Sequence, residues 1–189
     1  MDEMVKKALA KWPAVPHCYG WLGLDARGDW YLRDARAQAA GAFGSGPVAA
    51  RGSRLEHAGL IGFIKRNYAH DEAGQWFFQN GPQRVYVELQ ATPWIWRVAL
   101  DGAVHSHTGI AAAVRQVHTD EQGRVYLQTS DGFGLVHTQD VLTVADALEA
   151  GRWPAPQPLL AHELPARFGY VPSPLALSVE LLARNPSHD

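Results

Sequence analysis

The chain has 189 residues, of which 47% are hydrophobic and 19% are charged, with 17 basic and 19 acidic side chains. Disordered chains combine low hydrophobicity with a high net charge, and this chain has neither feature. The net charge of −2 also argues against nucleic acid as a partner, because holding a phosphate backbone requires a concentrated positive surface. We therefore expect a folded protein with a substantial hydrophobic core.

The sequence contains no recognisable export or membrane signal. The N-terminal segment alternates charged and small apolar residues, so it lacks the uncharged core of a signal peptide. No apolar run approaches the roughly 18 residues that a membrane-spanning helix needs. Cys18 is the single cysteine, which excludes an intrachain disulfide and a zinc site built from several thiolates. These features predict a cytoplasmic location and no membrane partner.

A short hairpin motif occurs three times, beginning at Asp25, Asp71 and Asp120. In each copy Gly follows three residues after Asp, and then come one polar residue and three large β-forming residues. Aspartate favours the start of a tight turn, glycine adopts the left-handed conformation that closes it, and the β-formers favour a returning strand. The pattern predicts three similar hairpins and an internal duplication.

Two helices are expected beside these hairpins. The first is predicted over Leu55–Tyr68, with Ser53 as N-cap and Glu56 completing a capping box. The second is predicted over Gln139–Ala150, with Thr138 as N-cap. Between the helices, alternating apolar and polar residues predict an antiparallel meander.

Two segments are less regular. Residues 35–52 are rich in Ala and Gly, which predicts a mobile loop. Seven of the 12 prolines lie between positions 154 and 186, together with several large apolar residues. This composition predicts an extended arm that lies across the body of the protein or across a second copy of the chain. A homodimer is therefore one expected assembly.

We predict an α+β fold with two β-rich halves that repeat a hairpin-and-helix motif. Residues 1–81 form the N-terminal half, and residues 82–151 form an antiparallel sheet that closes on itself beneath a helix. Residues 152–189 form the Pro-rich arm.

The pair His105 and His107 is the most metal-like feature of the sequence. Residues two apart on a strand point to the same side, so both rings can approach one ion, with His118 or His137 as a distant third ligand. The structural alternative is a pair of solvated or hydrogen-bonded strand histidines. No nearby acid completes a known metal spacing, so neither a metal nor a cofactor is predicted. A metal-dependent enzyme remains an alternative function.

A polar, donor-rich cluster is a stronger candidate for a site. Its predicted members lie at the end of the first helix, around the following hairpin turn and on a later strand: Arg66, Asn67, Gln79, Asn80, Gln83, Arg84 and Trp94. The two arginines offer forked donors to a carboxylate or phosphate, and the tryptophan offers a stacking wall. In the structural alternative, the cations offset the helix dipole and the tryptophan fills the core.

The cluster favours a non-enzymatic module that binds a small anionic molecule or regulates a partner. An interaction protein that assembles through its Pro-rich arm is the third alternative.

The order of these features resembles a family of uncharacterised proteobacterial proteins, domain of unknown function family 2944. The resemblance is carried by Gly28–Leu32, Leu55–Tyr68, Asp71–Phe78 and Arg84–Trp94. The chain is similar, more distantly, to domain of unknown function family 1285. That likeness implies a duplicated core whose C-terminal half looks like a pleckstrin-homology barrel. It also implies a nucleotide-like ligand at the interface of the two halves and a role in signalling.

Overall fold

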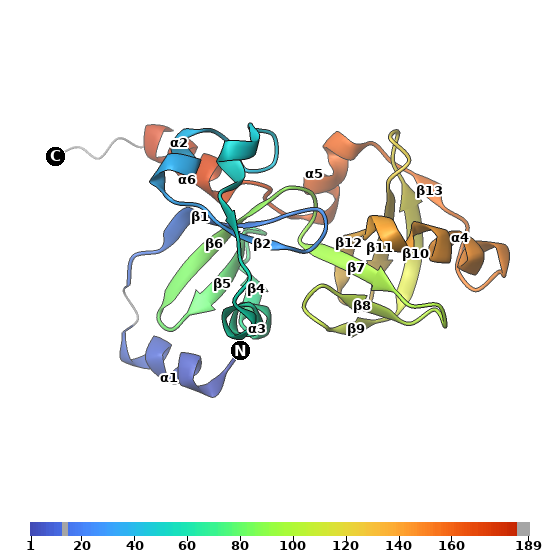
Figure 1. Ribbon diagram of the computed structural model, residues 1–189, viewed down its shortest axis with the longest axis horizontal. Helices are drawn as coiled ribbons and strands as arrows, with labels where there is room; N and C mark the ends of the chain where they lie inside the picture. Colours follow the sequence, from blue (N-terminus) through green and yellow to red (C-terminus); the bar gives the residue numbers. More distant parts are fainter. Residues whose placement is uncertain (13–14, 185–189) are drawn as a thin grey trace. The chain divides into compact units, whose positions relative to one another are not determined.

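The computed structural model describes residues 1–12 and 15–184, which form two compact units (Figure 1). Unit 1 comprises Met1–Asp25, Asp29–Gln90 and the segment from Val171 onward, and unit 2 comprises Ala26–Gly28 and Ala91–Tyr170. Each unit has its own β-sheet and its own buried apolar residues. The mixed α+β class with two β-rich parts confirms the predicted fold class.

The sheet of unit 1 has six strands in the described residues, in the order β3-β2-β1-β6-β5-β4. Their bounds are β1 (Cys18–Leu24), β2 (Trp30–Leu32), β3 (Ser53–Arg54), β4 (Tyr68–His70), β5 (Trp76–Asn80) and β6 (Gln83–Leu89). All neighbouring strands are antiparallel except the central pair β1 and β6. The helical segments of this unit are α1 (Glu3–Lys11), α2 (Ala35–Ala39), the 3-10 turn η1 (Val48–Arg51), α3 (Ala58–Arg66) and α6 (Pro174–Arg184).

Helices α3 and α6 pack on opposite faces of this sheet. The ring of Phe63 on α3 lies edge-on to Phe78 of β5, with centroids 5.3 Å apart. Val85 pairs with Phe78, so alternation along β6 directs Glu88 to the other face. There the Glu88 carboxylate accepts the backbone N–H of Leu175 in α6 at 3.0 Å.

Residues 35–52 are more structured than the predicted loop, since they contain α2 and η1. The buried guanidinium of Arg33 organises this segment. It donates hydrogen bonds to the carbonyl oxygens of Ala50 at 2.7 Å, Gly20 at 3.2 Å and Gly41 at 2.6 Å. Phe43, also from this segment, is buried. The Ala- and Gly-rich composition of this segment did not indicate that a buried cation would bind its carbonyl oxygens, so a loop was predicted.

The predicted capping box of the first helix is wrong. Ser53 belongs to strand β3 and pairs with Leu32 of β2, so it does not begin a helix. Helix α3 begins at Ala58, after the N-cap residue His57. The Nδ1 atom of His57 accepts the backbone N–H of Leu60 at 3.1 Å and takes the role assigned to Ser53.

The three hairpin turns share one local geometry, as the motif predicts. In each turn the aspartate carboxylate accepts the backbone N–H four residues later, at 2.9 Å for Asp25–Asp29, Asp71–Gln75 and Asp120–Arg124. The closing glycines all have positive φ: 84° at Gly28, 76° at Gly74 and 75° at Gly123. This conformation is strained for other residues, which explains why glycine recurs at that position.

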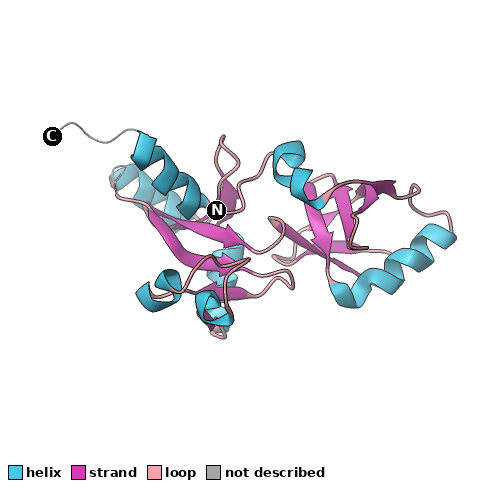
Figure 2. Ribbon diagram, turned by 90° about the horizontal axis from the view of Figure 1, so that it is seen from above, coloured by secondary structure: helices cyan, strands magenta, loops and turns pink. Residues whose placement is uncertain are grey.

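The sheet of unit 2 is a curled half-barrel (Figure 2). Its strands are β7 (Trp94–Val98), β8 (Val104–Ser106), β9 (Ala111–Ala112), β10 (Val114–Thr119), β11 (Val125–Thr129), β12 (Gly132–Val136) and β13 (Gln157–Pro158). They follow the order β13-β10-β11-β12-β7-β8-β9 in the described residues. The pairs β12–β7 and β10–β13 are parallel. The prediction of a wholly antiparallel sheet is therefore wrong for these two pairs.

The predicted second helix is confirmed, with slightly different bounds. It consists of the 3-10 turn η2 (Thr138–Asp140) followed by α4 (Val141–Glu149). His137, rather than Thr138, supplies the N-cap, because its Nδ1 accepts the N–H of Gln139 at 3.2 Å. Asp140 fixes the start of α4 on β7 by accepting from Arg97 Nε at 2.6 Å and from the backbone N–H of Val98 at 3.0 Å.

The Pro-rich C-terminal part is not a simple extended arm. It contains β13, the 3-10 turn η3 (Ala161–Glu163), α5 (Leu164–Phe168) and α6. Leu159, Leu164 and Tyr170 are buried in unit 2. From Val171 the chain returns to unit 1, where the N–H of Val171 bonds to the carbonyl oxygen of Gly74 at 2.9 Å.

The division into units also differs from the predicted halves. The predicted boundary after residue 81 falls inside the β5–β6 hairpin. Strand β6 is hydrogen-bonded to both β5 and β1, so residues 82–90 belong to unit 1.

Candidate functional site

Two predicted site residues, Arg66 and Asn67, lie at the C-terminal end of α3 and contact Asp2. Asn67 is buried, and its Oδ1 accepts the backbone N–H of Asp2 at 2.8 Å. Its Nδ2 donates to the carbonyl oxygen of Phe63 at 3.0 Å. Arg66 Nε lies 3.4 Å from Asp2 Oδ2. These two side chains therefore hold the beginning of the chain beside α3.

The β5–β6 hairpin carries the next three predicted residues. Gln79 is buried, and its Nε2 donates to the carbonyl oxygens of Gly81 at 2.9 Å and Gln83 at 3.3 Å. Gln83 Nε2 donates to the carbonyl oxygen of Pro16 at 2.9 Å. Both glutamines thus stabilise backbone geometry. Asn80 is exposed and lines the cavity described below.

Arg84 points to the other side of this hairpin. Its guanidinium carbon lies 4.5 Å from the ring centroid of Phe77, a cation–π geometry. It also borders a polar hollow beside the turn that follows β4. The structure therefore separates Arg84 from Asn80 by placing them on opposite faces of the sheet.

Trp94, the predicted stacking wall, belongs to unit 2. It is buried, and its Nε1 donates to the carbonyl oxygen of Asp131 at 3.1 Å. Its contribution to a ligand site stays a prediction.

The two candidate metal ligands lie in different environments. His105 is exposed on β8, whereas His107 is buried beyond the end of that strand. The Nδ1 atom of His107 accepts the N–H of Ile95 at 3.3 Å. Within residues 1–12 and 15–184, no group of three or more His, Cys, Asp or Glu side chains is placed to hold a metal ion.

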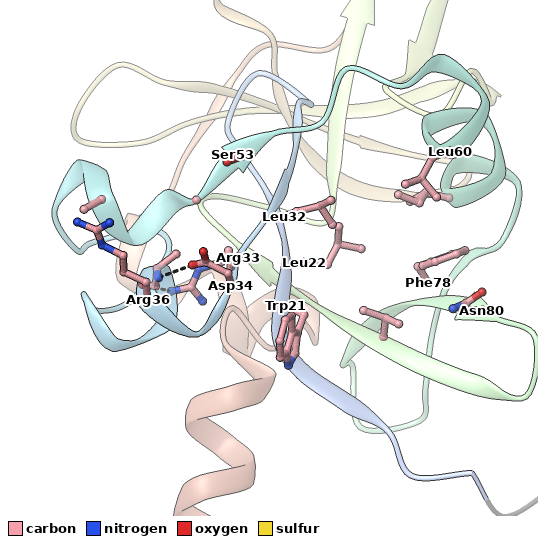
Figure 3. A pocket seen from close by; sticks show the side chains of 15 residues that line it. Trp21, Leu22, Leu32, Arg33, Asp34, Arg36, Ser53, Leu60, Phe78 and Asn80 are labelled. Atoms are coloured by element: carbon pink, nitrogen blue, oxygen red, sulfur yellow. Dashed lines mark hydrogen bonds between the residues drawn. The ribbon is translucent and has the colours of Figure 1, made fainter.

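A cavity of about 740 Å³ lies in unit 1 (Figure 3). Pockets that bind small organic molecules typically measure about 300–1,000 Å³. The lining residues are mostly apolar and come from five strands, from α2, α3 and η1, and from the segments that join them: Trp21, Leu22, Leu32, Arg33, Asp34, Arg36, Ala37, Ala49, Gly52, Ser53, Leu60, Ile64, Phe78, Asn80 and Val85. The cavity therefore has the size and lining of a small-molecule site.

Strand pairing and helix periodicity explain the apolar wall. Leu22 pairs with Leu32 across β1 and β2, and Phe78 pairs with Val85 across β5 and β6. Directly paired residues point to the same face, so these side chains gather on one side of the sheet. Leu60 and Ile64 are four residues apart on α3 and therefore occupy one side of that helix.

Two of the wall residues are unusually exposed for their type. Trp21, in the middle of β1, is 50% exposed, and Leu32, the last residue of β2, is 46% exposed. Apolar side chains that converge on a hollow and face water are a common mark of a binding surface.

Polar side chains lie on two sides of this wall. Figure 3 shows Asp34 and Arg36 on one side and Asn80 on the other, with Trp21 and Leu32 between them. The Asp34 carboxylate accepts the N–H of Ala37 at 2.8 Å as the N-cap of α2.

The two arginines of the lining differ in what they can offer to a ligand. Burial lowers the pKa of Arg33, whose guanidinium is already bonded to backbone carbonyls. Arg36 is exposed and forms no ion pair within the described part of the chain. Arg36 is therefore the cation of the lining that is available to a ligand.

The sequence indicated only part of this cavity. The helical spacing of Leu60 and Ile64 marked an apolar face, and Asn80 was a predicted site residue. Trp21 and Leu32 were missed, because the cavity that they line is also formed by residues of the segment 35–52, for which a loop was predicted.

The family of the chain follows from a match over most of its length. Residues 1–175 match the model of family DUF2944, described as "Protein of unknown function (DUF2946)". The chain belongs to this family. The family resemblance inferred from the hairpin and strand motifs is thus confirmed. No curated protein gives a significant match to this DUF2944 chain.

Two solved structures of DUF1285 family proteins are also similar. One is from Shewanella baltica OS155, with 15% sequence identity and a TM-score of 0.44, and the match covers 67% of this chain and 91% of that protein. The other is from Silicibacter pomeroyi DSS-3, with 14% identity and a TM-score of 0.44, covering 77% of this chain and 84% of that protein. In the described residues of this DUF2944 protein, no helix is both long and apolar enough to span a membrane.

Proposed function

We propose that this protein is a binding module, and that the cavity of unit 1 holds a small organic molecule with an apolar body and one carboxylate group. The observation that carries the proposal is the convergence of half-exposed Trp21 and Leu32 on a cavity of about 740 Å³. An apolar ligand would remove both side chains from water, and this burial is the main source of affinity in such sites.

Arg36 supports the choice of a carboxylate. Its forked guanidinium matches the geometry of a carboxylate, and Asp34, the one acid in the lining, is already engaged as a helix N-cap. The residues that line the cavity do not include a nucleophile with an acid or a base beside it. Binding without catalysis therefore fits this lining best. An anionic ligand agrees with the function predicted from the sequence, although it uses Arg36 rather than the predicted Arg66 and Arg84.

The apolar part of the proposal is tested with 1-anilinonaphthalene-8-sulfonate, a fluorescent probe for apolar sites, and with octanoate as its competitor. Trp21→Ala should weaken binding of both molecules about tenfold, because an aromatic wall is lost. Trp12→Ala is a matched control, since Trp12 is 52% exposed but lies outside the cavity. Equal binding by the Trp21→Ala variant and the wild type would contradict the proposal.

The charge preference is tested separately with octanoate and 1-octanol, which have the same apolar chain. Arg36→Gln should weaken octanoate binding and leave 1-octanol binding unchanged. If both molecules bind the variant as they bind the wild type, Arg36 does not select the anion.

A further inference from the structure

A polar hollow of about 600 Å³ lies on unit 1, beside the turn between β4 and β5. It is lined by His70, Asp71, Glu72, Ala73 and Arg84. Its strand residue Arg84 pairs with Gln79, next to the Phe78–Val85 pair that faces the apolar cavity. Because side chains alternate along a strand, Arg84 projects from the opposite face of the sheet. The hollow is thus independent of the cavity in the proposed function.

The guanidinium of Arg84 is held in place without being neutralised. It lies over the buried ring of Phe77, at 4.5 Å from the ring centroid. Among residues 1–12 and 15–184, it forms no ion pair, although two acids line the same hollow. A fixed cation with unused forked donors is suited to a carboxylate.

Asp71 does not compete for this cation, because its own carboxylate is occupied. Its Oδ1 accepts the backbone N–H groups of Ala73 at 3.1 Å and Gln75 at 2.9 Å. Its Oδ2 accepts the hydroxyl of Tyr86 at 3.1 Å and Nε2 of Gln75 at 3.3 Å. Four donors from the turn and the sheet therefore hold Asp71 as a structural residue.

Glu72 is the second charged group that a ligand can reach. It is exposed at the same turn and makes no ion pair in the described residues. The hollow thus presents one cation, Arg84, and one available anion, Glu72, and the carboxylate of Asp71 is engaged within the protein. A doubly charged phosphate would be repelled by the two carboxylates. A molecule with both charges would satisfy Arg84 and Glu72 together.

We propose that Arg84 and Glu72 form a binding site for a small zwitterion of the α-amino acid class. Arg84 binds the carboxylate of the ligand, and Glu72 binds its ammonium group. The ring of His70 adds a fixed wall, since its Nδ1 lies 3.0 Å from the carbonyl oxygen of Asp71.

The site is tested by two-dimensional amide NMR titration of the full chain with the protein amino acids. Acetate, ethylamine and inorganic phosphate serve as single-charge and dianion references. At least one amino acid should shift the amide signals of Glu72, Ala73 and Arg84 and bind more tightly than all three references. The proposal is overturned if no amino acid shifts these signals at millimolar concentration, or if phosphate binds most tightly.

Variants separate the two contacts. Arg84→Gln should weaken amino acid binding about tenfold or more, as expected for the loss of a charged, forked hydrogen bond. Glu72→Gln should remove the preference for the amino acid over acetate. Arg115→Gln, at an exposed arginine on β10 of unit 2, is the matched control and should bind as the wild type. Wild-type affinity in the Arg84→Gln variant would overturn the proposal.

This result is distinguishable from the proposed function. Trp21→Ala should leave amino acid binding unchanged, and Arg84→Gln should leave octanoate binding unchanged. Either site can therefore fail its test while the other passes.

Discussion

The hydroxyl of Tyr126 donates a hydrogen bond to Oδ2 of Asp120 at 2.9 Å. An equivalent bond joins Tyr86 to Asp71 at 3.1 Å in the other unit. In both cases the aspartate opens a hairpin turn, and the tyrosine lies on a strand of the adjoining sheet. The repeated sequence motif therefore specifies the turn, and a tyrosine attaches that turn to its sheet: Tyr126 from the returning strand β11 of the same hairpin, and Tyr86 from the neighbouring strand β6.

Asp120→Ala is expected to lower the free energy of unfolding by about 2–4 kcal/mol, because it leaves buried donors without an acceptor. The side chain of Asp120 is 0% exposed and also accepts Nε of Arg124 at 2.6 Å. Burial alone would raise the pKa of Asp120, but hydrogen bonds from Arg124 and Tyr126 lower it overall.

Urea denaturation measures this effect. Tyr126→Phe is the control, since it removes one donor and should cost only about 1 kcal/mol. If Asp120→Ala lowers the free energy of unfolding no more than Tyr126→Phe does, the other hydrogen bonds to this carboxylate do not stabilise the fold.

A second prediction concerns His118 on β10. Its ring is 2% exposed, and it lies against Phe133 and Phe168, with centroids 6.0 and 5.7 Å away. Burial lowers the pKa of His118, and the nearby Arg167 acts in the same direction. Unfolded histidine has a pKa of about 6.5. As the pH falls below this value, the unfolded chain binds a proton that the folded chain resists, so stability declines.

The wild type should therefore lose stability between about pH 7 and pH 5 more steeply than the variant His118→Phe. Urea denaturation at several pH values provides the comparison. His105→Phe, at an exposed position on β8, should retain the wild-type decline. Parallel curves for the wild type and His118→Phe would exclude this histidine as the source of the acid sensitivity.

A third prediction concerns the attachment of α6 to unit 1. The buried carboxylate of Glu88 accepts the hydroxyl of Ser173 at 2.5 Å and the N–H of Leu175 at 3.0 Å. Glu88→Ala should increase hydrogen exchange in α6 and destabilise unit 1 by about 1–3 kcal/mol. Ser173→Ala removes one of the two bonds and should have a smaller effect. Unchanged exchange in α6 after Glu88→Ala would mean that apolar packing alone holds this helix.

A fourth prediction concerns Arg33. Arg33→Met should lower the free energy of unfolding by about 2–4 kcal/mol, because several buried carbonyl oxygens lose their hydrogen-bond donor. Arg33→Lys should recover only part of this loss, since an ammonium group cannot reproduce the planar fork. Arg36→Met, at the exposed arginine three residues later, should change stability by no more than about 0.5 kcal/mol. Thermal unfolding that ranks Arg36→Met as the more harmful variant would contradict this assignment.

Local signals in the sequence predicted much of the fold. The Asp-x-x-Gly motif identified three turns, and residues at strand and helix spacing identified β5, β6 and the whole of α3. The prediction was wrong where distant residues decide the local structure. Serine is a favoured N-cap residue, but Ser53 pairs with Leu32 and therefore belongs to a strand. Strand β6 was assigned to the second half because its parallel partner β1 lies about 65 residues away in sequence.

The candidate site was predictable only in part for the same reason. Sequence proximity grouped Gln79, Asn80, Gln83 and Arg84 as one polar cluster. In the structure, strand alternation sends Asn80 to the apolar cavity and Arg84 to the polar hollow, while the glutamines bond to backbone carbonyls. Residue types indicated the chemistry available, but not the face of the sheet on which each side chain would lie.

The return of the chain to unit 1 after Tyr170 has a consequence for synthesis. On the ribosome, the six strands of unit 1 emerge before nearly all of unit 2, yet α6 emerges after it. Until α6 emerges, the side of β1 and β6 that this helix covers is exposed to solvent. We expect unit 2 to fold first, and the sheet of unit 1 to be covered only after α6 has emerged.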